Sequence, residues 1–216
     1  MRKYDYILFD LDGTLTASAE GVRLSIVHAM QKLDLPCPDL SNYSLYIGPP
    51  LVDTFRGLCA VPEELIPAVM QNYLEHYDLV GLVNNGVFDG VIPMLGKLRE
   101  AGCKIAVCTS KNEPVAERVV DEFGLRAYFD AICGSMLDGA RKEKAEVIPY
   151  TLDRLGCTDK SRAVMIGDTH FDARGASIAG VDFVGVTYGY GTREGMEAYG
   201  AVGFVDTPEE LLNFLI

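Results

Sequence analysis

The sequence has few of the side chains that build a zinc site. It contains three histidines, scattered along the chain, and six cysteines that form no Cys-x-x-Cys pair. Zinc sites need clustered nitrogen and sulfur ligands at short spacings, so the sequence does not predict one. Several cysteines lie inside apolar segments, and we expect them to be buried and reduced, as thiols are in the cytosol.

The sequence also lacks a block of Lys or Arg and any apolar run long enough to span a membrane. The formal net charge is −12 at pH 7, which disfavours nucleic acid and anionic membranes as partners of the surface as a whole. A helix that crosses a bilayer needs about 20 consecutive apolar residues. The N-terminal letters MRKYDYILFD lead into a predicted strand, without the pattern of a signal peptide. We therefore expect a cytoplasmic monomer or homodimer that acts on a small molecule.

Short apolar segments alternate with helical patterns along much of the chain. Six segments predict strands: YDYILF, KIAVC, AICG, AVMIG, FVGVT and GFV. Their continuous apolar character is typical of strands buried on both faces of a parallel sheet. The helical patterns VIPMLGKLREAG, EPVAERVVDEFG and KAEVIPYTLDRLG each end at a glycine, which is a helix-stop signal. The sequence therefore predicts an α/β fold with a Rossmann-like parallel sheet.

Polar residues follow three of these predicted strands. Asp10 ends the first, Thr109 and Ser110 follow KIAVC, and Asp168 follows AVMIG. In open parallel sheets, ligands bind beyond the carboxyl ends of the strands. We therefore expect these side chains to share one edge of the sheet.

The first two predicted strands of the core are separated by a long helical segment. A simple crossover needs far fewer residues, and a structureless loop of this length is improbable. The patterns EGVRLSIVHAMQKL, PLVDTFRGLC and EELIPAVMQNYLEHY predict helices in this gap. We interpret residues 16–84 as an inserted helical cap domain, and residues 1–15 and 85–216 as the core. The hinges are expected near Leu15–Ala17 and Asn84–Gly86, where a lid above the strand ends could exclude water.

The letters DLDGT place two carboxylates, Asp10 and Asp12, directly after a strand. Two close carboxylates repel each other unless a cation lies between them. Mg²⁺ takes oxygen ligands, commonly one or two carboxylates together with substrate phosphate. Asp168 could complete such a site, with Asp172 one helical turn later. A solvated turn or a calcium loop is the alternative, but the letters TLTASAE lack the further acidic positions of an EF-hand.

Four segments together resemble the ordered motifs of the haloacid dehalogenase superfamily: DLDGT, CTS, RKEKAEV and MIGDTHFD. Their order, with a helical insertion after the first, is similar to the subgroup with a helical cap, which includes phosphoglycolate phosphatases. The letters IGPPL, residues 47–51, resemble that branch. The resemblance covers nearly the whole chain.

The resemblance implies a role for each acidic position. Asp10 attacks phosphorus and becomes an aspartyl phosphate, while Asp12 protonates the leaving oxygen and then activates water. Asp10, Asp168 and the backbone carbonyl of Asp12 hold Mg²⁺. Asp172, from its spacing after Asp168 alone, is a further acidic ligand or a support for the others. A carboxylate nucleophile divides phosphoryl transfer into two steps, and cations stabilise the phosphoryl oxygens.

The resemblance also implies the residues that contact the phosphoryl group. Thr109 donates a hydrogen bond to it, and a lysine from RKEKAEV balances its charge. That lysine is Lys144 or Lys142, and we favour Lys144 because it begins a predicted helix. Ser110 and Lys111 follow Thr109 toward the predicted edge and are candidate substrate-binding residues.

A further set of residues has weaker claims to the site. The candidates in the predicted cap and beside Thr109 are Arg23, Tyr43, Tyr46, Arg56 and Asn112. The GYGTREG loop could line the site, although a simple glycine turn is the favoured interpretation. His170 is interpreted as a surface residue of a helix.

The sequence therefore predicts a Mg²⁺-dependent phosphatase that hydrolyses a small phosphomonoester, phosphoglycolate-like in the branch it resembles. A phosphomutase of the beta-phosphoglucomutase type would use the same intermediate but return the phosphoryl group to its substrate. Two more hypotheses stay open, a 5′-nucleotidase specificity and a non-catalytic binding module. The presence of both Asp10 and Asp12 argues against the binding module.

Overall fold

The computed structural model describes residues 3–136 and 140–216. Within these residues six strands form one sheet in which every neighbouring pair is parallel, in the order β3-β2-β1-β4-β5-β6. The strands are β1 (Tyr6–Phe9), β2 (Lys104–Asn112), β3 (Ala131–Ser135), β4 (Ala163–Gly167), β5 (Asp182–Val186) and β6 (Gly203–Val205). The predicted α/β fold with a parallel sheet is confirmed. Strand β2 is longer than KIAVC, because it continues through Thr109 to Asn112 with a register shift against β3.

Helices cover both faces of the sheet. One layer holds α4 (Val91–Glu100), α5 (Glu113–Glu122) and α9 (Pro208–Leu215); the other holds α6 (Lys144–Leu155), α7 (His170–Ala179) and α8 (Arg193–Glu197). Strand β1 contributes side chains to both layers, because side chains alternate between the two faces of a strand. Ile7 and Phe9 pack on the first layer, and Leu8 packs on the second. This two-sided burial is why the strand sequences are continuously apolar.

The predicted glycine stops coincide with helix ends. Helices α4, α5 and α6 end at Glu100, Glu122 and Leu155, within two residues of Gly102, Gly124 and Gly156. Gly156 has a φ of 68°, the left-handed conformation in which a residue without a Cβ closes a helix. None of the helices among the described residues has the length and apolar character needed to cross a bilayer.

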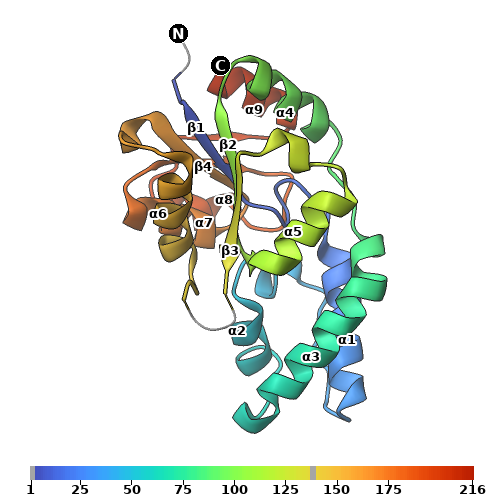
Figure 1. Ribbon diagram of the computed structural model, residues 1–216. Coiled ribbons are helices and arrows are strands. Elements are labelled where there is room, and N and C mark those ends of the chain that lie inside the picture. The colour runs from blue at the N-terminus through green and yellow to red at the C-terminus, as the bar shows by residue number, and fades with distance from the viewer. Residues whose placement is uncertain (1–2, 137–139) are drawn as a thin grey trace.

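The segment between β1 and α4 is helical, as predicted. It contains α1 (Ala19–Lys32), α2 (Leu51–Arg56), α3 (Ile66–His76), the π-helical turn η3 (Tyr77–Gly81) and the 3-10 turns η1 (Tyr43–Leu45), η2 (Glu63–Leu65) and η4 (Leu82–Asn84). Figure 1 shows α1, α2 and α3 below the carboxyl ends of the strands. Helix α2 is shorter than the letters PLVDTFRGLC suggested, because it ends at Arg56.

The two connections between this helical segment and the sheet run side by side. The amide of Ala17 donates to the carbonyl of Gly86 at 2.7 Å, and that of Phe88 donates to the carbonyl of Leu15 at 3.1 Å. The predicted hinges therefore form a paired junction. The division into a core and a cap domain, with boundaries at residues 16 and 84, stays a prediction.

Candidate active site

The polar residues predicted at the strand ends meet at one edge of the sheet. Strand β1 lies between β2 and β4, so Asp10, Thr109 and Asp168 come from three adjacent strands. The amide of Asp10 donates to the carbonyl of Ile166 in β4 at 2.8 Å. All three side chains are buried. The topology therefore brings together residues that lie far apart in the sequence.

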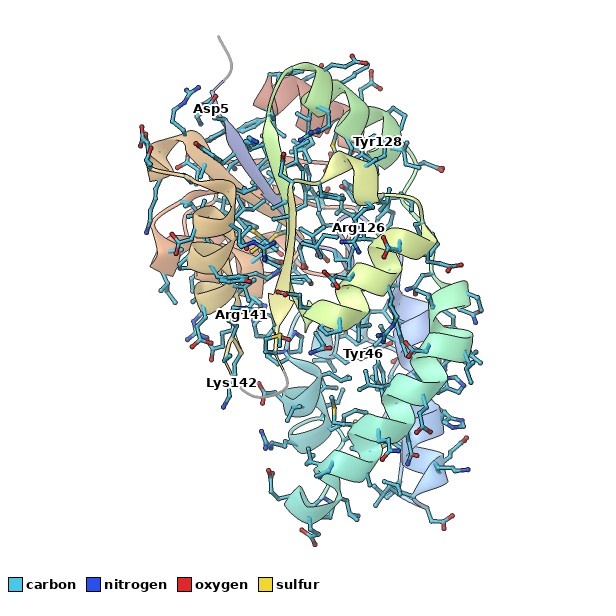
Figure 2. All side chains as sticks on the ribbon, in the orientation of Figure 1. Asp5, Tyr46, Arg126, Tyr128, Arg141 and Lys142 are labelled. Atoms are coloured by element: carbon cyan, nitrogen blue, oxygen red, sulfur yellow. The ribbon has the colours of Figure 1, made fainter. Side chains whose placement is uncertain are left out.

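Lys144 is the lysine that reaches Asp10. Its Nζ lies 2.7 Å from Asp10 Oδ1 and 2.8 Å from Asp172 Oδ1, and it donates to the carbonyl of Cys108 at 2.8 Å. Lys144 is the first residue of α6, and a capping box between Glu143 and residue 146 determines where the helix begins. Lys142, the alternative, is an exposed residue of the preceding loop (Figure 2).

Three carboxylates form a buried cluster around Asp10. One oxygen each of Asp10, Asp168 and Asp172 lies within 4.8 Å of the others. Burial, together with the charge of Asp172, raises the pKa of Asp10 to about 6, although Lys144 opposes the shift. Burial and the charges of Asp172 and Asp10 also raise the pKa of Asp168 well above its ordinary value. With one lysine among three carboxylates, the cluster is short of positive charge.

Asp168 and Asp172 are oriented by their neighbours. Asp168 accepts hydrogen bonds from the Thr14 hydroxyl at 3.2 Å and the Tyr190 amide at 2.7 Å. Asp172 Oδ2 accepts from the Thr169 amide at 3.1 Å and the Thr169 hydroxyl at 2.8 Å, in the capping box that starts α7. Its Oδ1 is buried and accepts no hydrogen bond from the described residues, although Lys144 Nζ lies beside it.

This arrangement fits a hard divalent cation. The donor set is made of carboxylate oxygens, which Mg²⁺ prefers, and one oxygen from each of the three carboxylates lies within 4.8 Å of the others. Glycines close the chain around Asp168: a Cβ on Gly13 would lie 2.3 Å from Asp168 Oδ2, and one on Gly191 would lie 2.0 Å from the Asp168 carbonyl oxygen. Of the predicted metal ligands, Asp10, Asp168 and Asp172 therefore lie together, while the Asp12 carboxylate is paired with Lys111. That these residues hold a metal stays a prediction.

The GYGTREG loop belongs to this site and is more than a glycine turn. Its Tyr190 amide holds Asp168. The neighbouring Tyr188 donates from its hydroxyl to the carbonyl of Thr14 at 3.0 Å. A Cβ on Gly189 would lie 2.3 Å from Asp168 Cβ. The favoured interpretation of this loop was therefore wrong, because its contribution comes from a backbone amide that the letters do not reveal.

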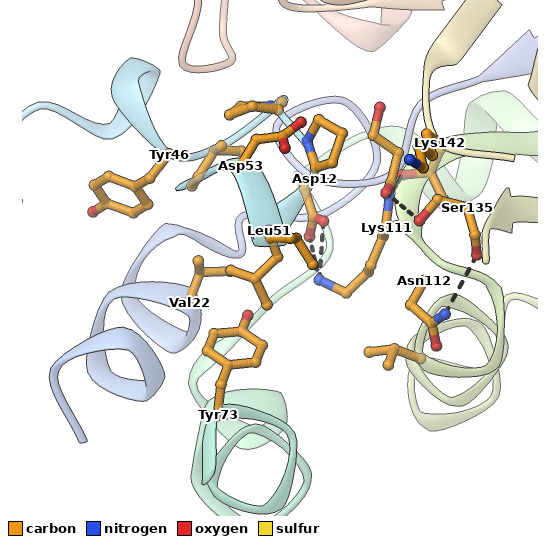
Figure 3. A pocket seen from close by; sticks show the side chains of 18 of the residues that line it. Asp12, Val22, Tyr46, Leu51, Asp53, Tyr73, Lys111, Asn112, Ser135 and Lys142 are labelled. Carbon is orange, nitrogen blue, oxygen red and sulfur yellow. Dashed lines mark hydrogen bonds and ion pairs between the residues drawn. The ribbon is translucent and has the colours of Figure 1, made fainter. Parts of the chain in front are cut away.

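Asp12 is paired with the second lysine of the site. Lys111 Nζ donates to Asp12 Oδ1 at 3.1 Å and to Oδ2 at 2.9 Å. Burial opposes the charge of Lys111, but Asp12, Tyr77 and Tyr73 outweigh it and raise its pKa above the ordinary value. Figure 3 shows the two side chains pointing toward each other, with Tyr73 on a neighbouring helix.

A cavity of about 460 Å³ lies in front of these residues. From the sheet, its lining includes Asp10, Asp12, Thr109, Ser110, Lys111 and Asn112. From the helical segment, it includes Val22, Tyr46, Arg56, Met70, Tyr73 and Leu74. The cavity is therefore lined both by the catalytic candidates and by the inserted helices. A role of these helices as a lid stays a prediction. Met70, Tyr73 and Leu74 were missed, because a helical pattern does not show which face meets the site.

The weaker candidates divide between the cavity and the surface. Tyr46 and Arg56 line the cavity, and Arg56 is paired with Glu63. Arg23 is paired with Glu20 and is not part of the lining. Tyr43 is also outside the lining and contacts the ring of Tyr190. His170 is exposed, as interpreted from the sequence.

The fold and the site define a class of α/β protein in which a carboxylate after the first strand meets a lysine and further carboxylates at the edge of a parallel sheet. The model of the family described as "Haloacid dehalogenase-like hydrolase" matches residues 7–186. Since this match covers most of the chain, the chain belongs to the haloacid dehalogenase-like hydrolase family. The resemblance predicted from the four motifs is confirmed.

Similar proteins within the family carry different names. Tyrosine-protein kinase PtkA of Mycobacterium tuberculosis is 41% identical over 86% of this chain, which spans only 62% of that protein. A 5′-nucleotidase of Pseudomonas aeruginosa is 38% identical, covering 91% of this chain and 89% of its own. A phosphoglycolate phosphatase of Caulobacter vibrioides is 34% identical, covering 97% and 91%. The crystal structure of a predicted phosphatase from Clostridium acetobutylicum has a TM-score of 0.90 and 37% identity, covering 97% of both chains.

Proposed function

We propose that this protein is a Mg²⁺-dependent phosphatase that hydrolyses a small phosphomonoester through an aspartyl phosphate on Asp10. One observation carries the proposal: the buried Asp10 carboxylate contacts Lys144 at 2.7 Å and faces the same cavity as Asp12. One carboxylate can thus attack phosphorus while a second, two residues away, handles the proton. Family membership and the phosphatase names of several relatives support this chemistry.

The first step transfers the phosphoryl group to the protein. An Asp10 oxygen forms a bond to phosphorus, the bond from phosphorus to the ester oxygen breaks, and Asp12 gives its proton to that oxygen. Lys144 holds Asp10 Oδ1 and so orients the nucleophile. The Thr109 hydroxyl, buried against the cavity, donates to a phosphoryl oxygen. Oriented donors of this kind stabilise charge that develops on the transferred group.

The second step releases phosphate. Asp12 takes a proton from water, the water oxygen bonds to phosphorus, and the bond to Asp10 breaks to restore the carboxylate. Asp10, Asp168 and the carbonyl of Asp12 would hold Mg²⁺, with Asp172 beside them, and the cation supplies neutralisation of the phosphoryl oxygens. In this scheme Asp12 changes from acid to base between the two steps.

Phosphoglycolate is the first candidate substrate, on the strength of the branch resemblance and the Caulobacter vibrioides relative. Its second anionic group needs a cation in the cavity. Among the described residues, three cationic side chains line the cavity: Arg56, Lys111 and Lys142. Arg56 is paired with Glu63 and Lys111 with Asp12, so Lys142 is the first candidate to contact a small carboxylate.

A nucleoside monophosphate is the second candidate. The cavity of about 460 Å³ is larger than phosphoglycolate requires, and Val22, Met70 and Tyr73 give it an apolar, partly aromatic wall. An apolar wall with a few polar groups is typical of sites for planar ligands. The Pseudomonas aeruginosa relative named 5′-nucleotidase supports the same candidate.

The test is phosphate release from 4-nitrophenyl phosphate, phosphoglycolate and a set of nucleoside monophosphates, with Mg²⁺ and with EDTA. Activity that needs Mg²⁺ and disappears in Asp10→Asn supports the proposal, and the ratio of kcat/KM values selects the substrate class. A phospho-isomer formed without phosphate release would establish a phosphomutase instead. Inactivity on the whole panel would overturn the hydrolase proposal. The cytoplasmic location and the monomeric or homodimeric state stay predictions.

A further inference from the structure

Lys111 is enclosed between the proposed acid–base residue and the inserted helices. Its side chain is 9% exposed, and its Nζ contacts both carboxylate oxygens of Asp12. The same Nζ lies 4.5 Å from the centre of the Tyr77 ring. A cation over an aromatic face is attracted to it, most strongly when both are removed from water. Lys111 therefore joins Asp12 to Tyr77.

Asp12 depends on this one lysine. Among residues 3–136 and 140–216, no other side chain or amide donates to its carboxylate. Asp12 lies on the loop that follows β1, where the backbone does not by itself determine the direction of the side chain. The Lys111 ammonium is thus the group that orients the Asp12 carboxylate toward the cavity.

Tyr77 is held rigidly within the helical segment. It is 1% exposed, its ring stacks on Tyr73 at 5.7 Å, and its hydroxyl accepts a hydrogen bond from Asn85 at 2.7 Å. Its turn η3 packs directly on α1, since a Cβ on Gly21 would lie 2.1 Å from the carbonyl oxygen of Gly81. A movement of these helices relative to the sheet would carry the Tyr77 ring with it.

We propose that Lys111 is a positioning residue: it holds the Asp12 carboxyl at the leaving-group oxygen, and Tyr77 makes this hold depend on how the inserted helices sit on the sheet. The inference rests on the proposed function, because it concerns the proton transfer by Asp12. It differs from a role for Lys111 in binding substrate, since the lysine would then act on the substrate without Asp12.

A double-mutant cycle between Lys111→Met and Asp12→Asn separates the two roles. We expect Lys111→Met to lower kcat/KM on the alkyl phosphate selected by the panel by roughly 10- to 100-fold, part of what a positioned acid–base group contributes. In the Asp12→Asn background, Lys111→Met should lower kcat/KM by less than about threefold, because the effects of substitutions at residues that act as one unit are not additive. Lys111→Arg keeps a cation at this position, so its kcat/KM should fall less than that of Lys111→Met.

The leaving group supplies an independent measurement. The first-turnover burst of 4-nitrophenolate needs little help from an acid, because 4-nitrophenolate is a good leaving group. Lys111→Met should therefore change this burst by less than about threefold, well below its effect on the alkyl phosphate. Equal losses on both substrates, or an undiminished loss in the Asp12→Asn background, would overturn the inference and assign Lys111 to substrate binding.

Two further variants test the connection through Tyr77. Tyr77→Leu removes the ring beneath Lys111, so it should lower kcat/KM on the alkyl phosphate more than it lowers the 4-nitrophenolate burst. Tyr77→Phe keeps the ring, so its kcat/KM on the alkyl phosphate should fall less. Arg118→Met is the matched control, because its exposed ion pair with Asp78 also joins α5 to η3 but does not reach Asp12. If Arg118→Met lowered kcat/KM on the alkyl phosphate as much as Tyr77→Leu, the connection through Tyr77 would be overturned.

The two proposals fail in different ways. Inactive wild-type protein would overturn both of them. An active wild type in which the effects of Lys111→Met and Asp12→Asn are additive would overturn only this one.

Discussion

Lys144 Nζ lies 2.7 Å from Asp10 Oδ1, although 134 residues separate the two in the sequence. The contact joins the first residue of α6 to the end of β1, and both side chains are almost completely buried. An ion pair in such a place is costly to break, because the partner left behind is a buried charge. The two residues proposed to act in catalysis should therefore also determine stability.

Replacing Asp10 with asparagine should abolish turnover. The amide has nearly the shape of the carboxylate but cannot form the phosphoryl ester, so we expect kcat to fall by at least about 10³-fold. Phosphate release measures the loss, and thermal unfolding verifies that the variant is folded. An Asp10→Asn protein within tenfold of wild type would exclude Asp10 as the nucleophile.

Lys144 should be important for stability as well as for activity. Lys144→Met leaves Asp10 and Asp172 without their shared cation, and removing one partner of a buried pair costs about 3–5 kcal/mol. Urea unfolding in EDTA measures this cost. The matched control is Lys142→Met on the exposed loop, where a surface substitution should stay within about 0.5 kcal/mol. Equal effects of the two variants would argue against the buried role of Lys144.

The metal-free protein should lose stability as pH rises. The pKa of Asp10 is raised to about 6 and that of Asp168 is also raised, so the folded state binds more protons than the unfolded state above about pH 4. The stability that these protons supply is complete below that pH and is lost as pH rises through 6. Asp168→Asn carries no charge at this position, so in EDTA its free energy of unfolding at pH 7.5 should exceed that of the wild type.

With Mg²⁺ present, the wild type should be more stable than Asp168→Asn, the reverse of the order expected in EDTA. Wild type gains stability from a bound cation by mass action, whereas Asp168→Asn lacks one of the proposed ligands. Thermal unfolding from pH 4.5 to 8, with Mg²⁺ and with EDTA, measures both effects. An Asp168→Asn variant that gains as much from Mg²⁺ as wild type would contradict the proposed metal site.

Gly189 should tolerate no side chain. A Cβ there would lie 2.3 Å from Asp168 Cβ, so Gly189→Ala must displace Asp168 or its own loop, at a cost of about 1–3 kcal/mol. Mg²⁺ binding, followed by calorimetry, should weaken with it. Gly96→Ala in α4 is the control, since its Cβ would meet Tyr128 only at 4.0 Å and helix propensity favours alanine by about 1 kcal/mol. Similar melting temperatures for Gly189→Ala and Gly96→Ala would contradict a steric clash between a Cβ at position 189 and Asp168.

Local pattern in the sequence was enough to predict the parallel sheet, the glycine stops and the residues after each strand. Burial on both faces makes a strand continuously apolar, and a sheet edge gathers whatever follows its strands. Asp10, Thr109 and Asp168 therefore meet as expected. The structure places Lys144 beside Asp10, because the start of α6 determines which lysine faces the sheet. Its preference over Lys142 as the phosphate-binding lysine stays a prediction.

Only the tertiary structure decided the contacts that local pattern does not encode. The pairing of Lys111 with Asp12 spans 99 residues. Lys111 also lies over the ring of Tyr77, in the turn η3 that packs on α1 where Gly21 meets Gly81. The hold on Asp168 comes from the Tyr190 amide, a backbone group that every residue except proline possesses. Such contacts depend on how separate elements pack against each other, and for that reason the sequence determined the chemistry at the strand ends while the fold determined what surrounds it.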